Sequence, residues 1–272
     1  MSTEQYQITI VQYGTRLTEK SDVFLNYRIH HEPDAPFRVD YFFWVISNAE
    51  RTVIVDTGFS KDAGESRGRS FVVEPALAYD ALGVDASTAP EVLITHAHYD
   101  HAGNLGLFPQ SRITIAEAEY AFTQSGLINR AQFAYAYDTK DAEALADAKT
   151  QGRLRSFAGS VDIAPGITMV ELGGHTAGQS VVLVDTSEGT VLIASDAIHF
   201  YEEFDLDRPF AFVGDLAGTY QGFDSIRTLI ETDVKHLISG HDPDTLNRFA
   251  AVAEGPLAGF AATIGGAPAS AG

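Results

Sequence analysis

The chain contains no cysteine. Without a thiol it can form no disulfide, no iron–sulfur cluster, no thiolate-bound zinc site and no cysteine nucleophile. Long apolar runs are also missing, since no segment approaches the roughly 20 apolar residues that a transmembrane helix needs. Residues Met1 to Tyr6 show no basic stretch followed by an apolar one, so we expect no secretory signal. From these absences we expect a cytoplasmic protein without a membrane partner.

Basic residues are scarce. The chain has 18 Lys and Arg against 37 Asp and Glu, a formal net charge of -19. Such a surface repels a phosphate backbone, so we expect no nucleic-acid partner. The simplest role of the acidic surplus is solubility, although some carboxylates could be metal ligands. A neutral small-molecule substrate, such as a lactone or ester, would be unaffected by the negative electrostatic field of the protein.

The length and hydrophobic content favour one folded domain. The chain has 272 residues, of which 45% are hydrophobic, which is enough for one substantial core. We expect a single domain over residues 1–260. Residues 261–272 are mostly Ala, Gly, Pro and Ser, and they are expected to form a disordered tail.

Short apolar segments of strand type alternate with helical patterns. Strands are predicted at 6–12, 41–47, 52–55, 92–95, 112–115, 167–172, 180–185, 191–195 and 236–239. Helices are predicted at 73–82, 116–125, 141–151, 222–231 and 243–252. This mixture predicts an α/β domain with sheets inside and helices outside. Residues 126–159 show no strand pattern, and their aromatic side chains fit either a lid over a pocket or a surface helical hairpin.

The segment from Thr95 to Gly103 reads THAHYDHAG and follows an apolar strand. Four of its residues are of metal-ligand type: His96, His98, Asp100 and His101. In an extended segment His96 and His98 project to the same side, so both can reach one ion. A turn after them would direct Asp100 and His101 to a second ion nearby. Such spacing arises by chance on the order of once in a thousand chains, which argues against a solvated polar loop.

Three further ligand-type residues occur in similar settings. His175, Asp196 and His241 each lie just after an apolar strand, where loops gather and sites form. Any one of them alone would more often be a structural or surface residue. Together with the histidine-rich segment they indicate one shared metal site.

The motif resembles the signature of the metallo-β-lactamase superfamily. The match comprises His-x-His-x-Asp-His at positions 96 to 101, then His175, Asp196 and His241 in order, with an Asp-x-Gly element at Asp56. The resemblance implies a four-layer αββα sandwich. It implies that His96, His98 and His175 bind the first metal, that Asp100, His101 and His241 bind the second, and that Asp196 bridges them. Asp56 would support a ligand through a hydrogen bond.

Within that superfamily the chain is most similar to the N-acyl homoserine lactonases. Well-known members carry a tyrosine three residues after the bridging aspartate, where this chain has His199, with Tyr201 close behind. Either residue could donate a hydrogen bond to a developing oxyanion. The acidic residues 202–207 are expected in a solvated loop.

The resemblance implies a hydrolase that opens a lactone ring with a hydroxide shared by two divalent metal ions. Zinc is the expected metal, and manganese, cobalt and iron share the ligand set. Asp100 or Asp196 would carry a proton to the leaving alkoxide. His199 or Tyr201 would help to hold the oxyanion.

Other functions remain open from the sequence. One keeps the enzyme class and changes the bond, as in a thioester hydrolase of the glyoxalase II type or a β-lactamase, whose Lys or Arg anchors are not identifiable here. Another is a non-catalytic metal-binding protein that retains the fold. Oligomeric state is also open, with a homodimer as the commonest outcome for a soluble enzyme.

Overall fold

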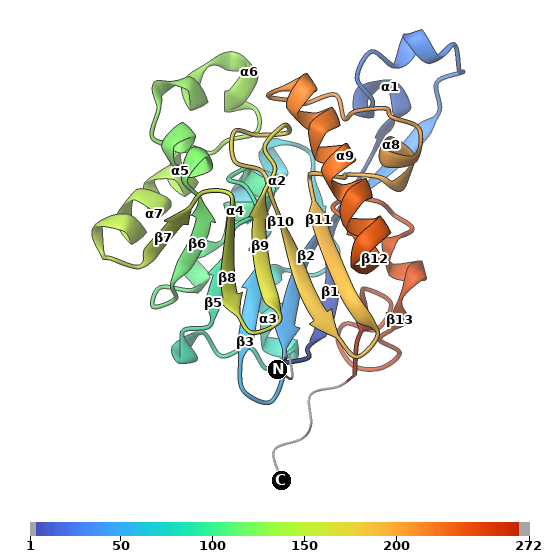
Figure 1. Cartoon of the computed structure of the whole chain (residues 1–272). Helices are drawn as coiled ribbons and strands as arrows, with labels where there is room; N and C mark the ends of the chain where they lie inside the picture. The colour runs from blue at the N-terminus through green and yellow to red at the C-terminus, as the bar shows by residue number, and fades with distance from the viewer. Residues whose placement is uncertain (1–3, 267–272) are drawn as a thin grey trace.

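The apolar segments predicted as strands form two β-sheets (Figure 1) in the computed structural model, which describes residues 4–266. The larger sheet has the strand order β13 (Ala250–Ala251), β14 (Ala261–Ile264), β1 (Gln7–Glu19), β2 (Pro36–Ser47), β3 (Thr52–Val55), β5 (Glu91–Leu93), β6 (Ile113–Ala116) and β7 (Leu154–Phe157), with β4 (Ser70–Phe71) paired to β1. The smaller sheet has the order β12 (Val234–Ser239), β11 (Gly189–Ser195), β10 (Ser180–Thr186), β9 (Ile167–Glu171) and β8 (Ser160–Ala164).

Side-chain alternation explains why both faces of each sheet are buried. In β2, Phe42 and Trp44 pack in the core between the sheets, whereas Phe43 and Val45 pack in the core beneath the helices. Every residue from Val39 to Ile46 is therefore buried, and the strand has no polar face. Such near-continuous apolar runs are typical of strands covered on both sides.

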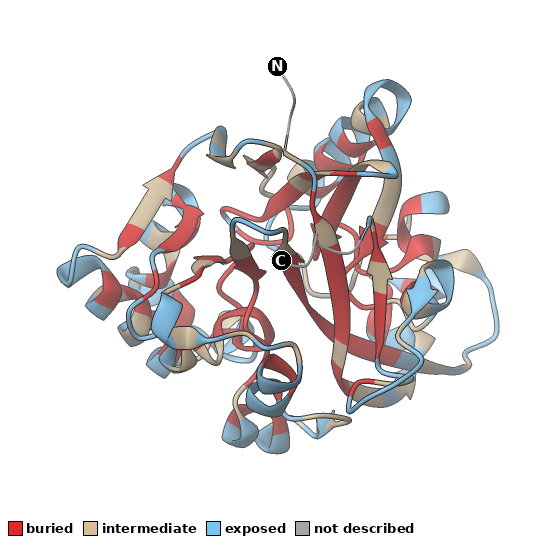
Figure 2. Ribbon diagram, turned by 90° about the horizontal axis from the view of Figure 1, so that it is seen from below, coloured by how far each residue is buried: buried red, intermediate tan, exposed pale blue. Residues whose placement is uncertain are grey.

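Helices cover the outer face of each sheet. On the larger sheet these are α2 (Lys61–Ser66), α3 (Pro75–Ala81), α5 (Glu117–Thr123) and α7 (Thr139–Thr150), and on the smaller sheet α8 (Tyr201–Asp205) and α9 (Leu216–Thr232). Shorter helices are α1 (Lys20–Val23), α4 (Tyr99–Ala102) and α6 (Ala131–Ala134), with 3-10 turns at Tyr27–His30, Ala86–Thr88, Leu105–Leu107, Gly126–Asn129 and Thr245–Arg248. Burial is concentrated in the strands and exposure in the outer helices (Figure 2). This is the predicted four-layer αββα sandwich.

Strand direction brings the predicted site together. In the larger sheet β3, β5, β6 and β7 are parallel. In the smaller sheet β11 is parallel to β12, and β9 is antiparallel to β10, which is antiparallel to β11. The strands β9, β11 and β12 therefore run in the same direction, and the loops that follow them open at one edge. Helices α4 and α8, which follow β5 and β11, lie at this edge, the upper one in Figure 1.

Three local predictions were wrong. Residues 243–252 are not a helix: they form a 3-10 turn followed by β13, because Phe249 packs against the core between the sheets and the next two residues pair with β14. The predicted disordered tail does not begin at Ala261, because residues 261–264 form β14 and pair with β1. The rest of that prediction, for residues 267–272, lies outside the described residues. The segment 126–159 does contain a strand, β7, which pairs with β6.

No helix among residues 4–266 combines the length and the apolar character that crossing a bilayer requires.

Candidate metal centre

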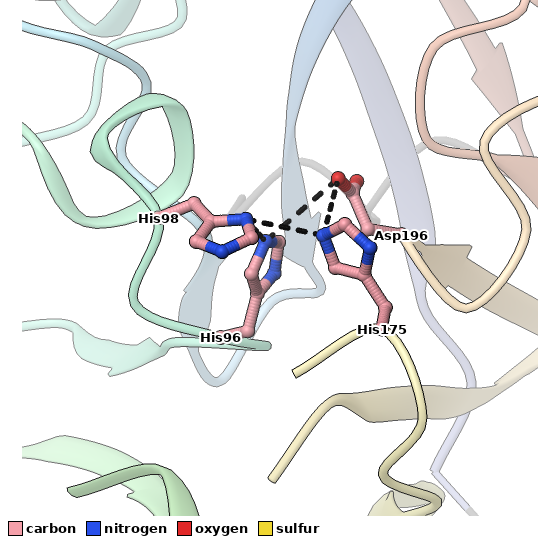
Figure 3. Close-up of side chains that lie close together, drawn as sticks. All are labelled: His96, His98, His175 and Asp196. Carbon is pink, nitrogen blue, oxygen red and sulfur yellow. Dashed lines mark hydrogen bonds and ion pairs between the residues drawn. The ribbon is translucent and has the colours of Figure 1, made fainter. Parts of the chain in front are cut away.

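Four predicted ligands converge in a first group, formed by His96, His98, His175 and Asp196 (Figure 3). The Nε2 of His96 lies 2.9 Å from the Nδ1 of His98, and that Nδ1 lies 3.1 Å from the Nε2 of His175. The Oδ2 of Asp196 lies 3.5 Å from the His175 nitrogen. Nitrogen atoms that share one zinc ion at about 2.0–2.1 Å would lie roughly 3.3 Å apart, so these spacings suit a single ion.

The remaining three ligands form a second group, and Asp196 connects it to the first. Asp100, His101 and His241 offer ligand atoms within 4.8 Å of one another. The other Asp196 oxygen, Oδ1, lies 3.2 Å from the Nε2 of His101 and 3.1 Å from the Nε2 of His241. One carboxylate thus presents one oxygen to each group, as a bridging ligand does.

The unsatisfied atoms of the cluster fit a metal ion. Among residues 4–266, the Nε2 of His101 and the Oδ1 of Asp196 are buried and make no hydrogen bond. Leaving a buried polar atom unpaired costs about 1–3 kcal/mol, so bound cations would remove a penalty. Neutral imidazole and carboxylate are the donors that zinc and related metals bind.

Charge at the two groups differs. Burial lowers the pKa of His98 to about 3 and lowers the pKa of His96 and His175 well below their usual value, so these imidazoles are neutral and free to bind a metal. Burial also acts to lower the pKa of His101, but the carboxylates of Asp196 and Asp56 outweigh it and raise that pKa well above its usual value. The second group therefore attracts positive charge, whether a proton or a cation.

Hydrogen bonds fix the ligand side chains from behind. Asp56 accepts from the backbone N–H of Thr95 at 2.8 Å, and its other oxygen lies 2.8 Å from the Nδ1 of His101. The Nδ1 of His241 lies 2.7 Å from the backbone carbonyl oxygen of Asp40. Such partners orient the ring and direct the opposite nitrogen toward the metal. The predicted hydrogen bonds of Asp56, to a histidine and to the loop backbone, are present.

A cavity of about 390 Å³ opens above the ligands. The ligand residues on its wall are His98, Asp100, His175, Asp196 and His241. Its other walls come from β1, β2, the segment after α2 and the loop 210–212, and its size is within the range of small-molecule sites.

Residues 126–159 contribute one wall of the cavity. Tyr135 borders the cavity, and Tyr137 is buried with its ring 4.7 Å from that of His98. Phe133 packs against Phe122 instead. The two expectations for this segment both hold in part, because helices pack its rings into the core while one tyrosine faces the pocket.

Comparisons with known proteins agree with this geometry. A family model described as the metallo-beta-lactamase superfamily matches residues 38–241. The chain belongs to the metallo-β-lactamase superfamily. An N-acyl homoserine lactonase of a Bacillus species is 26% identical over 219 residues, which cover 73% of this chain and 80% of that protein. The N-acyl homoserine lactonase AttM of Azorhizobium caulinodans is 24% identical over 249 residues, covering 82% and 90%.

Solved structures of lactonases share the fold. A quorum-quenching N-acyl homoserine lactone lactonase matches with a TM-score of 0.78 at 18% identity, over 93% of this chain and 99% of that one. The dizinc quorum-quenching lactonase AidC matches with a TM-score of 0.69 at 16% identity, over 89% and 90%. These comparisons confirm the predicted superfamily, the fold, the class of metal-dependent hydrolase and the resemblance to the lactonase branch.

His199 is not on the cavity wall, where the superfamily resemblance suggested it. Its Nε2 lies 3.2 Å from the Oδ2 of Asp196, and its Nδ1 lies 3.0 Å from Glu203. The ring of Phe210 stacks on it at 4.0 Å and lines the cavity in its place. Burial alone would lower the pKa of His199, but Glu203 and Asp196 raise it to about 9. His199 thus contacts Asp196, and Phe210 separates it from the cavity.

Tyr201 is not brought to the ligands either. Its hydroxyl donates to the carbonyl oxygen of Leu237 at 3.2 Å, and its ring lies under the guanidinium of Arg248. The predicted contact with a substrate oxyanion is therefore absent for this residue, because its side chain packs against β12.

Three supporting groups were not predicted. Glu119 is fully buried, and its carboxylate accepts from the backbone N–H groups of Ala97 and Gly178, each at 2.9 Å, and from the hydroxyl of Tyr137 at 3.0 Å. It thereby joins the loops that carry His98 and His175.

Glu203 was expected in a solvated loop, and that prediction was wrong. Its carboxylate is buried and accepts from the backbone N–H groups of His199 and Phe210 at 2.7 and 2.9 Å. The spacing of four residues between His199 and Glu203 was the available sequence signal. The third unpredicted group is a pair of arginines, Arg16 and Arg69, on the cavity wall.

Proposed function

We propose that this protein hydrolyses the ring ester of a small lactone with two divalent metal ions, zinc being the first candidate. The observation that carries the proposal is the position of Asp196, whose two oxygens face two separate groups of ligands at the base of one cavity. His96, His98 and His175 would hold one ion, and Asp100, His101 and His241 the other. Bound there, the ions would supply Lewis-acid activation of a carbonyl group and of water.

The side chains divide the remaining work. Asp100 and Asp196 both line the cavity, but the two oxygens of Asp196 face the two groups, so Asp100 is the carboxylate left to take up a proton from water and return it to the leaving alcohol. His199, held by Glu203, fixes the orientation of Asp196 from behind. The ring of Phe210 screens that pair of charged groups from the cavity. No serine or cysteine nucleophile is needed.

The choice of a lactone is supported by the names of the relatives. Both sequence relatives described above are N-acyl homoserine lactonases, and they match this chain over most of their length. A thioester of the glyoxalase II type remains the second candidate, because the arginines on the cavity wall could anchor the anionic group of such a substrate.

A pH-indicator screen of lactones, thioesters and β-lactams, run on zinc-loaded protein, tests the proposal. We expect lactones to be hydrolysed, and we expect His98→Ala and Asp100→Ala to lose activity by roughly a factor of 10³ or more, since each removes a ligand. His236→Gln is the matched control, since His236 lies on β12 outside the cluster. Hydrolysis of thioesters alone would favour the second candidate, and unchanged activity in His98→Ala would refute the metal site.

A further inference from the structure

Two arginines line the cavity, one on strand β1 and one just before strand β4 of the larger sheet. Arg16 lies on β1 opposite Val39 of β2, and both residues line the cavity. Arg69 precedes β4, which pairs with β1, and it lines the cavity as well. The pairing of β1 with β2 and β4 is therefore what places two positive charges at one wall.

The charges of both arginines lie near Tyr41, which also lines the cavity. The guanidinium of Arg69 lies 6.0 Å from the ring centre of Tyr41, and the ring of Tyr41 lies 5.1 Å from that of His241. Burial raises the pKa of Tyr41 to about 12, while the positive charges of Arg69 and Arg16 both act to lower it. The positive wall is thus next to the second group of ligands.

Neither arginine is neutralised by a carboxylate. Among residues 4–266, no carboxylate oxygen lies within 4.0 Å of either guanidinium, whereas other arginines, such as Arg38 and Arg227, are ion-paired. The Nε of Arg16 is buried and makes no hydrogen bond to any of the described residues. Asp22 also lines the cavity, but it is exposed and accepts from the hydroxyl of Thr18 at 3.0 Å.

Arg69 is held in place by uncharged partners. Its Nε donates to the hydroxyl of Tyr99 at 3.0 Å, and its Nη2 donates to the hydroxyl of Tyr135 at 2.8 Å. These hydroxyls orient the guanidinium and leave its charge uncompensated. In a chain with a net charge of -19, whose overall field disfavours anions, such a local pair of cations is what an anionic ligand would require.

The side of the site next to His98 and His175 is more apolar. A smaller cavity of about 130 Å³ borders His98 and His175, and most of its remaining lining is apolar, including Phe122, Phe133 and Phe212. The two sides of the metal centre therefore differ in polarity. A substrate that crosses the centre would place an apolar part on one side and its most polar part on the other.

We propose that Arg16 and Arg69 form an anion-binding subsite, so that the substrate carries a carboxylate at the end that lies beside Tyr41 and His241. This inference rests on the proposed lactone hydrolysis and specifies its substrate class. The two arginines bind and orient the substrate, and they take no part in the proton transfers assigned to Asp100.

The test compares lactones in matched pairs, each pair differing only by a carboxylate against an isosteric carboxamide, with the group on the ring or at the end of an acyl chain. For at least one pair we expect kcat/KM to be about tenfold to a hundredfold higher for the carboxylate, as charge-assisted hydrogen bonds provide. Arg16→Gln and Arg69→Gln should each reduce that preference toward unity by raising KM for the carboxylate, with little change for the carboxamide. Arg16→Lys should retain part of it.

Arg67→Gln is the matched control. Arg67 donates to the backbone carbonyl oxygen of Tyr135 at 2.7 Å and is not part of the cavity lining. Its substitution therefore measures the effect of disturbing this loop while the two cavity arginines stay in place. Equal hydrolysis of both members of every pair would overturn the subsite while leaving the proposed function intact. So would an equal loss on both members in Arg69→Gln and in Arg67→Gln. If no lactone of either kind were hydrolysed, the proposed function would fail and the subsite with it.

Discussion

Single residues decide whether the metal centre can be assembled. The predicted ligands come from four loops, and each loop needs a group that fixes it before an ion could bind. Asp56 holds His101, the Asp40 carbonyl oxygen holds His241, and Glu119 joins two loops through their backbone N–H groups. Groups of this kind usually matter for metal affinity almost as much as the ligands do.

Glu119→Gln should weaken metal binding without removing a ligand. A neutral amide binds the backbone N–H groups of Ala97 and Gly178 less strongly than a carboxylate does. We expect metal affinity and turnover to fall by about tenfold to a hundredfold, measured by competition with a chromophoric chelator and by initial rates. Glu117→Gln on the exposed face of the same helix is the control. Wild-type affinity in Glu119→Gln would show that the loops are fixed without this carboxylate.

Asp141 should make stability depend on pH. Burial, reinforced by Asp138, raises the pKa of Asp141 to about 7 from a value near 3.8. The folded state therefore holds this proton where the unfolded state has lost it, so the contribution to stability declines from about pH 4 to about pH 7. Asp141→Asn removes that decline and should raise the free energy of unfolding at about pH 8 by roughly 1–3 kcal/mol. Denaturant unfolding of the wild type and the variant at about pH 4 and about pH 8 checks this.

The exposed Asp147 on the same helix provides the comparison for that experiment. Asp147→Asn should change stability little at either pH. An Asp141→Asn variant no more stable than the wild type at about pH 8 would contradict the raised pKa of this buried carboxyl.

Residue-level prediction from the sequence succeeded where chemistry and spacing coincided. The seven predicted ligands are all His or Asp, they follow apolar strands and they have the spacing of the motif, and the structure brings them together. Glu119, Arg16 and Arg69 carry no such signal, because only the folded sheets bring them to the site. His199 shows the reverse case: its position in the chain suggested a contact with substrate, but the ring of Phe210 covers it.

At the level of elements, the strands were easier to predict than the chain's last segments. Strands buried on both faces, such as β2 and β11, show as continuous apolar runs. The strand β14 consists largely of small residues. Its position depends on backbone pairing with β1, and the amino-acid composition gives no sign of that pairing. The sequence before β13 predicts a helix, but only a 3-10 turn forms there. It ends at Arg248, because Phe249 packs against the core between the sheets.

Removing β14 should destabilise the fold. Residues 261–264 pair with β1, and Ile264 is buried in the core between the sheets. Burying one such side chain contributes about 1.5–3 kcal/mol, so a chain that ends at Phe260 should unfold several degrees lower than the full chain. A chain that ends at Gly266 keeps the strand and is the control. Equal melting temperatures for the two truncated chains would mean that β14 adds nothing to stability.

For the whole molecule, the surplus of acidic residues is linked to the predicted metal centre. Asp100 and Asp196 are buried together among the ligands, and bound cations would compensate their charge. Because metals bind the folded state, they should stabilise it by mass action. We expect a chelator to lower the melting temperature of the zinc-loaded protein by several degrees and to abolish hydrolysis, with both restored by zinc. A melting temperature indifferent to chelation would count against the centre.

The most direct measurement is a titration of metal-free protein with zinc, in which bound ions per chain and lactone hydrolysis are followed together. The account predicts about two ions per chain, with activity rising as the sites fill. His98→Ala, which loses a ligand of the first group only, should still bind about one ion. Full hydrolysis of lactones by the metal-free protein, or saturation of the wild type at far fewer than two ions per chain, would contradict it.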